Sequence, residues 1–526
     1  MHEVITLQFG HQANYLGTHY WNTQESYFTY TGQPDSPVNH DISFRPGLGP
    51  NGDDTYSPRT LIYDLKGAFG TLRRENALYE IQQQDEGQPG GWSGATIPLQ
   101  LSHIAPSPYQ QALDEGSAPP RLTADTVRYW SDYNHIFYHP RSLIQLNSYE
   151  SNSSLMPFEH FATGEELFRD LDREHDLLDR DLRPWLEECD HLQALQILTG
   201  TDDAWGGFAA RYLERINDEM GKGCRWVFGL QDSQRTTRQR QAVQNSNVAR
   251  SLVSFNDNAS MHILLASMPG VLPAYVTGFD GGSKWQTSAL QAAVMESFTL
   301  PSRLRQGEDG RASFDMLETT LNNEGNRSVA AASMSVSEAH DEATGTAQTN
   351  GNGHHDTRMA NGYADVRAED DAGTDAPELD ISFLPLPATN ERSLSRRPRF
   401  LSTVTSTRGH DPNSIDEEEE MNALLRDRMG EGPRVATYRS SLLFPGLSSF
   451  PPIFRFQGQN EKFAIKTSVS MTSGVAERIR GLESSVRTGF GVDVEEREAL
   501  CDSLVGMAEG YEEGWMSDDD DDFGGD

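Results

Sequence analysis

The stretch "ILTGTDDAWGGFAARYL", from Ile197 to Leu213, decides the fold of this chain. An apolar run enters the stretch, a turn containing glycine lies in its middle, and an amphipathic pattern leaves it. A strand, a glycine turn and a helix in this order form the layout of a phosphate-binding loop. Yet Asp202 and Asp203 stand where a phosphate would require bare glycine amides. The stretch therefore raises the question whether a nucleotide site is present or has been lost.

The segments on either side of this stretch predict an α/β fold. Residues 191–198 have the apolar pattern of a buried strand, residues 208–220 that of a helix with one apolar face, and residues 224–230 that of the next strand. Strand, helix and strand in succession indicate a βαβ unit, and hence a doubly wound parallel sheet. Residues 4–9 and 59–64 predict further strands. Residues 163–190 predict a helix that Pro184 kinks.

Composition excludes several classes of function. The 526 residues carry a formal charge of −36, with 79 acidic against 43 basic side chains. Such a surface repels polyphosphate, so we expect no nucleic-acid partner and no binding to anionic lipid. The three cysteines are few and scattered, which predicts a reducing compartment rather than a disulfide framework.

One uncharged run, residues 258–279, is long enough to span a bilayer. It contains Pro269 and Pro273, which would break the helix needed to satisfy its backbone in lipid. We therefore expect a buried strand and loop, and no transmembrane segment. The opening residues lack the pattern of a signal or transit peptide, so neither is expected.

Composition also suggests domain boundaries. Residues 1–300 are expected to form the α/β domain. From about Pro301 the composition changes, and residues 324–380 have almost no large apolar side chains. This predicts a disordered insertion over residues 301–380, because such a segment cannot bury enough surface to offset chain entropy. Residues 381–510 are expected to form a second, carboxy-terminal domain, and residues 511–526 a solvated acidic tail.

Three segments resemble tubulin. Residues 1–21, "MHEVITLQFGHQANYLGTHYW", are similar to the tubulin amino terminus, and residues 59–73 and 189–213 are similar to its second segment and its glycine-loop segment. The matching places in the first segment are Glu3, Gln8, Gly10, Asn14, Gly17 and Trp21. The order and spacing of the segments agree over much of the first 230 residues, whereas the carboxy-terminal half matches poorly. The resemblance implies a tubulin/FtsZ-like fold: a doubly wound parallel sheet, a second α+β domain and a long disordered insertion.

The departures from tubulin affect the nucleotide loops. Tubulin's glycine loop falls on residues 202–208, where Gly206 alone occupies a glycine place, and Trp205 and Phe208 are too bulky for close backbone approach. A carboxylate about 4 Å from a phosphate costs on the order of 4 kcal/mol at intermediate dielectric. Lys66 replaces the acidic residue that the resemblance assigns to magnesium. The resemblance therefore gives a degenerate set of cofactor positions: Gly10, Gln12, Asn14, Asp64, Asp202, Asp203, Gly206 and Gly207.

Asp202 and Asp203 have two interpretations. In the first interpretation, the two carboxylates bind a magnesium ion and so hold a nucleotide, since magnesium sites with two carboxylates exist. Alternatively, they cap the helix that begins near Gly206, and this second interpretation is favoured. Asp64 is expected to cap a turn rather than to hold a metal. No catalytic residue and no metal site are predicted, since Cys189, His191 and Cys224 lack metal-ligand spacing.

As a whole, the pattern resembles the Misato family, whose fungal members are mitochondrial distribution-and-morphology proteins. The resemblance implies a non-enzymatic role in partitioning mitochondria and inheriting mitochondrial DNA, without GTP or magnesium. It places the protein in the cytoplasm and on the outer, cytosolic face of the mitochondrion. It also implies protein partners, namely the cytosolic chaperonin or tubulin. Two rival functions are a GTP-binding, self-assembling GTPase and an accessory factor in chaperonin-assisted tubulin folding.

Overall fold

The computed structural model describes residues 2–29, 32–48, 54–72, 104–221, 223–234, 236–323, 325–338, 379–385, 398–409, 433–456, 462–489 and 493–512. Its strands are β1 (Glu3–Phe9), β2 (Phe44–Leu48), β3 (Asp54–Pro58), β4 (Thr60–Lys66), β5 (Leu143–Glu150), β6 (Leu192–Gly200), β7 (Cys224–Gln231), β8 (Met261–Ala266), β9 (Val329–Glu338), β10 (Ile381–Ser382), β11 (Phe400–Arg408), β12 (Arg434–Ser440), β13 (Phe444–Pro445) and β14 (Lys462–Thr472). Its α-helices are α1 (His11–Glu25), α2 (Pro108–Asp114), α3 (Phe161–His175), α4 (Arg183–Glu187), α5 (Ala204–Met220), α6 (Arg238–Asn258), α7 (Lys284–Thr299), α8 (Phe314–Leu321), α10 (Ser473–Thr488) and α11 (Val494–Glu509). Short turns of helix include η5 (Leu178–Leu182) and η6 (Leu300–Arg303).

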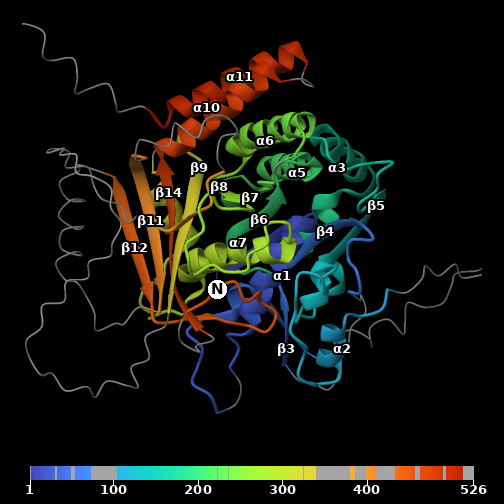
Figure 1. The fold of residues 1–526 in the computed structure, drawn as a ribbon, viewed down its shortest axis with the longest axis vertical. Helices are drawn as coiled ribbons and strands as arrows, with labels where there is room; N and C mark the ends of the chain where they lie inside the picture. The colour runs from blue at the N-terminus through green and yellow to red at the C-terminus, as the bar shows by residue number, and fades with distance from the viewer. Residues whose placement is uncertain are drawn as a thin grey trace, which may run out of the picture.

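One twelve-stranded sheet organises the molecule (Figure 1). Ten of its strands follow the order β12-β11-β14-β9-β8-β7-β6-β1-β4-β5, and the short strands β10 and β13 pair with β9 and β14. The strands from β9 to β5 are parallel, whereas β14 runs antiparallel to both of its neighbours, β9 and β11. Helices α1 and α7 cover one face of the parallel part, and α3 and α5 cover the other. Helix α6 packs beside α5, and α10 and α11 pack on α6. All seven residues of β1 are buried because both faces of the sheet are covered.

Most of the predicted elements are confirmed. The apolar patterns at residues 4–9, 191–198 and 224–230 form β1, β6 and β7. The uncharged run forms the buried strand β8 followed by a loop, as expected. No helix in the described ranges is both long and apolar enough to cross a bilayer. The helix predicted over residues 163–190 ends earlier than expected, because Asp176 adopts a left-handed conformation with φ of 46°.

The predicted insertion begins too early. Residues 301–338 contain α8 and β9, although they were expected to be disordered. Strand β9 lies between β8 and β14, where Ala330, Ala332 and Met334 are fully or almost fully buried. Strand β9 is rich in alanine and serine, and its alanines are nevertheless buried, so a shortage of large apolar residues misled the prediction. Residues 339–378 lie outside the described residues.

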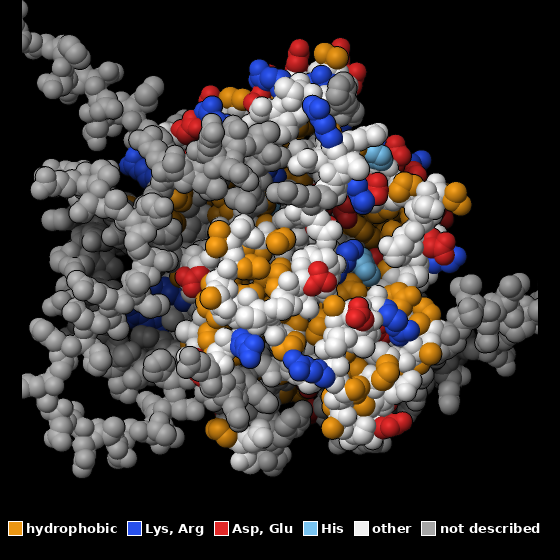
Figure 2. All heavy atoms as spheres, in the orientation of Figure 1, with side chains coloured by type: hydrophobic (Ala, Val, Ile, Leu, Met, Phe, Trp, Pro, Cys, Tyr) orange, Lys and Arg blue, Asp and Glu red, His pale blue; other side chains and the backbone are white. Residues whose placement is uncertain are grey.

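The other predicted boundaries also shift. Strands β11, β12 and β14 of the expected carboxy-terminal domain continue the same sheet through β9, so no break in the sheet separates the two parts. Tyr511, assigned to the acidic tail, is buried, and its hydroxyl donates to the carbonyl oxygen of Val329 at 2.7 Å. Residues 513–526 lie outside the described residues. On the face shown in Figure 2, acidic and basic side chains are interspersed rather than gathered by sign.

Close packing of α3 on α5 depends on Gly164. A Cβ built there would overlap the carbonyl oxygen of Ala204 and lie 2.7 Å from the amide nitrogen of Phe208. We expect Gly164→Ala to lower the free energy of unfolding by about 1 to 3 kcal/mol, because rigid backbone must move. Gly506 in α11 is the matched control, since a Cβ there meets nothing within 4 Å. Gly506→Ala is expected to stabilise by about 0.5 to 1 kcal/mol. Urea unfolding of both variants checks this contrast, and equal effects would contradict it.

Candidate functional site

The predicted site residues meet at one edge of the sheet. Strands β1, β4 and β6 are parallel neighbours, so their carboxyl ends bring together Gly10, Asp64 and the turn at residues 201–203. Ligands of open α/β sheets bind at this edge. Asn14 joins the cluster from α1, and Gln12 lies half-buried in the first turn of the same helix.

Asp64 and Asn14 form a buried pair. The Asn14 side-chain amide donates to Asp64 Oδ2 at 2.7 Å, and the Leu65 amide donates to Asp64 Oδ1 at 2.9 Å. Asp64 is 1% exposed, and this burial raises its pKa to about 7. His11 Nδ1 lies 4.0 Å from Asp64 Oδ2, but burial lowers the pKa of His11 to about 3, so its ring is neutral. The Asp64 carboxyl of β4 therefore binds the Asn14 side chain of α1 and the amide of Leu65, the residue at which the next turn begins.

Trp205 closes the space between Gly10, which follows β1, and the turn at residues 201–203, which follows β6. A Cβ built on Gly10 would overlap the indole ring and lie 2.6 Å from Trp205 Cε2. The ring also packs edge-on against Phe158 and Phe208, with centroids 5.2 and 5.6 Å away. Trp205 is 5% exposed. Its indole thus occupies the surface of Gly10 that a phosphate would have to approach.

The two aspartates have different roles. Asp203 is the N-cap of α5, and its Oδ1 accepts from the Trp205 amide at 2.9 Å. The predicted cap is confirmed for Asp203, although the helix begins at Ala204 instead of near Gly206. Asp202 caps nothing: its Oδ2 accepts from the Asp232 amide at 2.9 Å, beyond the end of β7. Burial, and then repulsion from Asp203, raises the pKa of Asp202.

Gly206 and Gly207 serve the packing of helices. A Cβ on Gly206 would overlap Ser251 Oγ of α6, and a Cβ on Gly207 would overlap the Phe161 carbonyl oxygen of α3. Both glycines lie in the first turn of α5 and are buried. Their lack of side chains therefore lets three helices approach one another, which is a sufficient physical reason for glycine at both positions.

Sequence reasoning missed two residues of this region. Asn247 of α6 donates from its side chain to the Asp202 carbonyl oxygen at 2.9 Å and accepts from the Phe161 amide at 3.0 Å. Lys284, the first residue of α7, is the cation whose charge acts on His11, Asp64 and Asp203. Asn247 lies in a mostly polar helix and Lys284 begins another, so neither carries a local sequence signal.

A nucleotide with magnesium does not fit these residues. The indole of Trp205 covers Gly10, and the carboxyls of Asp202 and Asp203 lie at the start of α5 where a phosphate would sit. Each of the two carboxyls already accepts a backbone amide. Within the described ranges, no group of three or more His, Cys, Asp or Glu side chains has the geometry of a metal site.

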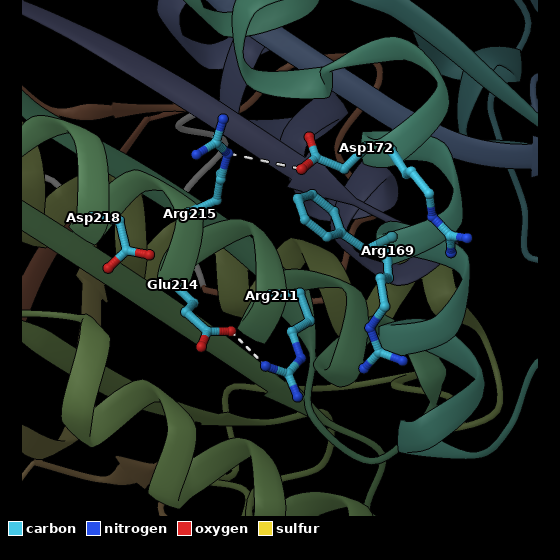
Figure 3. Close-up of a pocket in the computed structure, with 8 residues that line it drawn as sticks. Arg169, Asp172, Arg211, Glu214, Arg215 and Asp218 are labelled. Carbon is cyan, nitrogen blue, oxygen red and sulfur yellow. Dashed lines mark hydrogen bonds and ion pairs between the residues drawn. The ribbon is translucent and has the colours of Figure 1, made fainter.

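Two cavities lie elsewhere in the described part of the molecule. One, of about 340 Å³, is a charged groove between α3 and α5. Figure 3 shows Arg211 directed at Glu214, and Arg215 at Asp172, with nitrogen–oxygen distances of 2.6 and 3.7 Å. These ion pairs balance the charges of Arg211 and Arg215. The groove is therefore a surface network of charges between α3 and α5. The second cavity, of about 320 Å³, lies between α6 and α11. No predicted site residue lines either cavity.

Asp202 makes stability depend on pH. The folded protein keeps the Asp202 proton at a pH where the unfolded chain has released it, because the pKa is raised above its ordinary value of 3.8. The wild-type protein thus loses stability as the pH rises from that value through the raised pKa, by at most about 1.4 kcal/mol per pH unit. Asp202→Asn keeps an oxygen for the Asp232 amide and has no proton to lose. We expect Asp202→Asn to raise the free energy of unfolding above that of the wild-type protein, and to do so by more at about pH 8 than at about pH 5.

Urea unfolding at both pH values checks the prediction. Asp170→Asn is the control, because the Asp170 side chain is 73% exposed. Its replacement should change the free energy of unfolding little at either pH. An Asp202→Asn effect of the same size at both pH values would refute the assignment of a buried carboxyl.

The chain was compared with known proteins. Residues 119–304 match the family described as "Tubulin domain", and residues 2–115 match "Misato Segment II tubulin-like domain". The chain is 43% identical over 534 residues to protein dml1 of Aspergillus clavatus, with 99% of each chain covered. It is 42% identical over 552 residues to protein dml-1 of Neurospora crassa, again with 99% of each covered. A relative from Schizosaccharomyces pombe, also named dml1, is 34% identical over 58% of this chain and 66% of its own.

Proposed function

This chain belongs to the Misato and Dml1 family of tubulin-like proteins, and we propose that it acts without a nucleotide in distributing mitochondria and passing on mitochondrial DNA. The family and the tubulin-like fold are thereby confirmed as predicted from the sequence. The mitochondrial role is what the family resemblance implies. Within that role the protein is a scaffold that binds other proteins, not an enzyme.

The position of Trp205 carries this proposal. Its indole lies on Gly10, and Asp203, which is ionised above its pKa of about 6, lies at the start of α5, so both shape and charge oppose an anionic cofactor. A self-assembling GTPase would need this edge of the sheet to be open to phosphates. The rival GTPase function therefore has less support than a scaffold.

We further propose that the protein works in the cytoplasm and on the outer, cytosolic face of the mitochondrion. Its partners there are proteins, namely the cytosolic chaperonin or tubulin, and not nucleic acid. The formal charge of −36 supports the exclusion of nucleic acid, because a polyanion and an acidic surface repel each other.

Titration with labelled GTP tests the cofactor part of the proposal. Purified full-length protein with magnesium is expected to show no saturable binding, and tubulin serves as the positive control for the assay. Saturable binding in the micromolar range would favour the GTPase instead.

Microscopy tests the location and the role. A tagged full-length chain is expected to overlap with a mitochondrial marker, and depletion is expected to cluster mitochondria and to lose mitochondrial DNA. Capture of chaperonin subunits with no mitochondrial overlap, and normal mitochondrial DNA after depletion, would support the accessory factor of tubulin folding instead.

A further inference from the structure

Strand β12 forms one end of the large sheet. It pairs in parallel with β11 over Arg434 to Ser440, and the strand order ends there (Figure 1). Among the described residues, no strand pairs with its outer side. Val435 is 51% exposed, and Arg434 and Thr437 are exposed as well. The outer side of such a strand presents backbone amides and carbonyls that are available to another extended chain.

The two faces of β12 each carry one cation. Arg434 and Arg439 are five positions apart, so their side chains project from opposite faces of the sheet. The strand has no carboxylate of its own. By contrast, β5 at the opposite end of the sheet contains one charged residue, Glu150. The β12 end therefore differs in charge from the other end and from the acidic chain as a whole.

The neighbouring strands extend the basic character on one face. The registers align Arg439 with Thr407 of β11, Lys466 of β14 and Ser335 of β9 in a single row across the sheet. The next two rows on this face contain hydroxyl side chains and two small apolar ones: Ser333, Ser468, Thr405 and Thr437, then Ala331, Ser470, Thr403 and Val435. These three rows contain two cations and no carboxylate. Thr403, Thr405, Ser468 and Ser470 are at most 4% exposed, so the exposed part of this face lies on β12 itself.

The open part of the edge has a defined length. Gly310 lies against the backbone of Arg439, because a Cβ built there would overlap the Arg439 carbonyl oxygen. As far as the described residues occupy this edge, the stretch left for another chain runs from Arg434 to about Tyr438, with the Arg439 side chain at its end. A second copy of β12 would bring two more arginines and no carboxylate, which disfavours pairing between copies.

We propose that β12 binds an extended, acidic segment of a partner protein by strand addition. Backbone hydrogen bonds hold the segment, and its acidic side chains meet Arg434 on one face and Arg439 on the other. Since the arginines are five positions apart, the matching carboxylates are also five positions apart. The inference concerns a surface remote from the degenerate nucleotide loops and does not depend on the mitochondrial role.

A synthetic peptide tests the proposal on the purified full-length protein. The probe is a short threonine- and valine-rich peptide with glutamates five positions apart, labelled for fluorescence anisotropy. We expect it to bind, a peptide with the glutamates four apart to bind more weakly, and a peptide with lysines in their place not to bind. Reversing both arginines, with Arg434→Glu and Arg439→Glu, should weaken binding of the glutamate peptide by roughly tenfold or more.

The control keeps the same change of charge at another place. Arg169→Glu with Arg173→Glu reverses two arginines on α3 and should leave binding unchanged. Hydrogen exchange on the wild-type protein locates the peptide without any mutation, because amides between residues 434 and 438 should become protected while those of β5 do not. Equal binding of the lysine peptide, insensitivity to the β12 reversal, or protection confined to other strands would each overturn the proposal.

Discussion

Replacing Glu296 by alanine is expected to lower the free energy of unfolding by about 3 to 5 kcal/mol. Glu296 of α7 is the buried anion that faces two buried arginines, Arg303 of η6 and Arg408 of β11. The three side chains are each at most 1% exposed. Removal of the carboxylate leaves two guanidinium groups in the protein interior with no opposite charge, which is a far larger loss than that of one surface ion pair.

The hydrogen bonds of Glu296 join separate parts of the fold. Its Oε1 accepts from Arg303 at 3.0 Å, from Gln24 at 3.1 Å and from the Tyr27 hydroxyl at 3.1 Å, and its Oε2 accepts from Arg408. These partners come from α1, the segment after it, η6 and β11. The cluster therefore connects the amino-terminal half of the chain to a strand of the carboxy-terminal half.

Two controls separate the loss of charge from the loss of contacts. Arg303→Met leaves one arginine opposite Glu296, so the remaining pair is neutral and the loss should be smaller. Asp170→Ala breaks an exposed pair with Arg173, whose side chains are 73% and 72% exposed, and should cost less than about 1 kcal/mol. Urea unfolding measures all three variants. If Glu296→Ala costs no more than Asp170→Ala, the buried cluster is not a stabilising unit.

The same cluster shows where prediction from the sequence ends. Apolar periodicity placed β1, β6, β7 and most of α5, because each of these elements packs a repeating apolar side against the sheet. Glu296 and Arg408 are 112 positions apart, and no local pattern marks either as the partner of the other. A link of this kind is visible only once β11 is known to lie near α7. For the same reason the sequence suggested a domain boundary at residue 300 where the sheet continues.

The candidate site was predicted in part, and for a specific reason. The tubulin resemblance aligned both nucleotide loops, so Gly10 and Trp205 were already marked as matched and mismatched positions before their contact was known. The cap by Asp203 follows from its place before a helix. The role of Asp202 did not follow, because its partner, the Asp232 amide, lies on another strand end. Gly206 and Gly207 could be assigned to packing only after α3 and α6 were located beside them.

Replacing Trp205 by alanine is expected to lower the free energy of unfolding by about 3 to 5 kcal/mol without creating a GTP site. The indole fills the space between Gly10, Phe158 and Phe208, and its removal leaves a cavity that these rigid neighbours cannot fill. Trp205→Phe retains an aromatic ring and should cost less than Trp205→Ala. Urea unfolding ranks the two variants against the wild-type protein.

GTP titration of the same variants separates shape from charge. Trp205→Ala opens the approach to Gly10 but leaves Asp202 and Asp203 at the start of α5. Asp203 is ionised above its pKa of about 6, and a carboxylate about 4 Å from a phosphate opposes binding by on the order of 4 kcal/mol, so affinity should remain undetectable at neutral pH. If Trp205→Ala binds GTP, the indole alone blocks the site, and the chain is a nucleotide-binding protein held shut by its own side chain. Combining Trp205→Ala with Asp203→Asn at neutral pH then tests the charge directly, because Asp203 is ionised above its pKa of about 6 and asparagine keeps an oxygen for the Trp205 amide. The electrostatic explanation requires that removing this carboxylate raises affinity further, whereas a purely steric block predicts no additional gain.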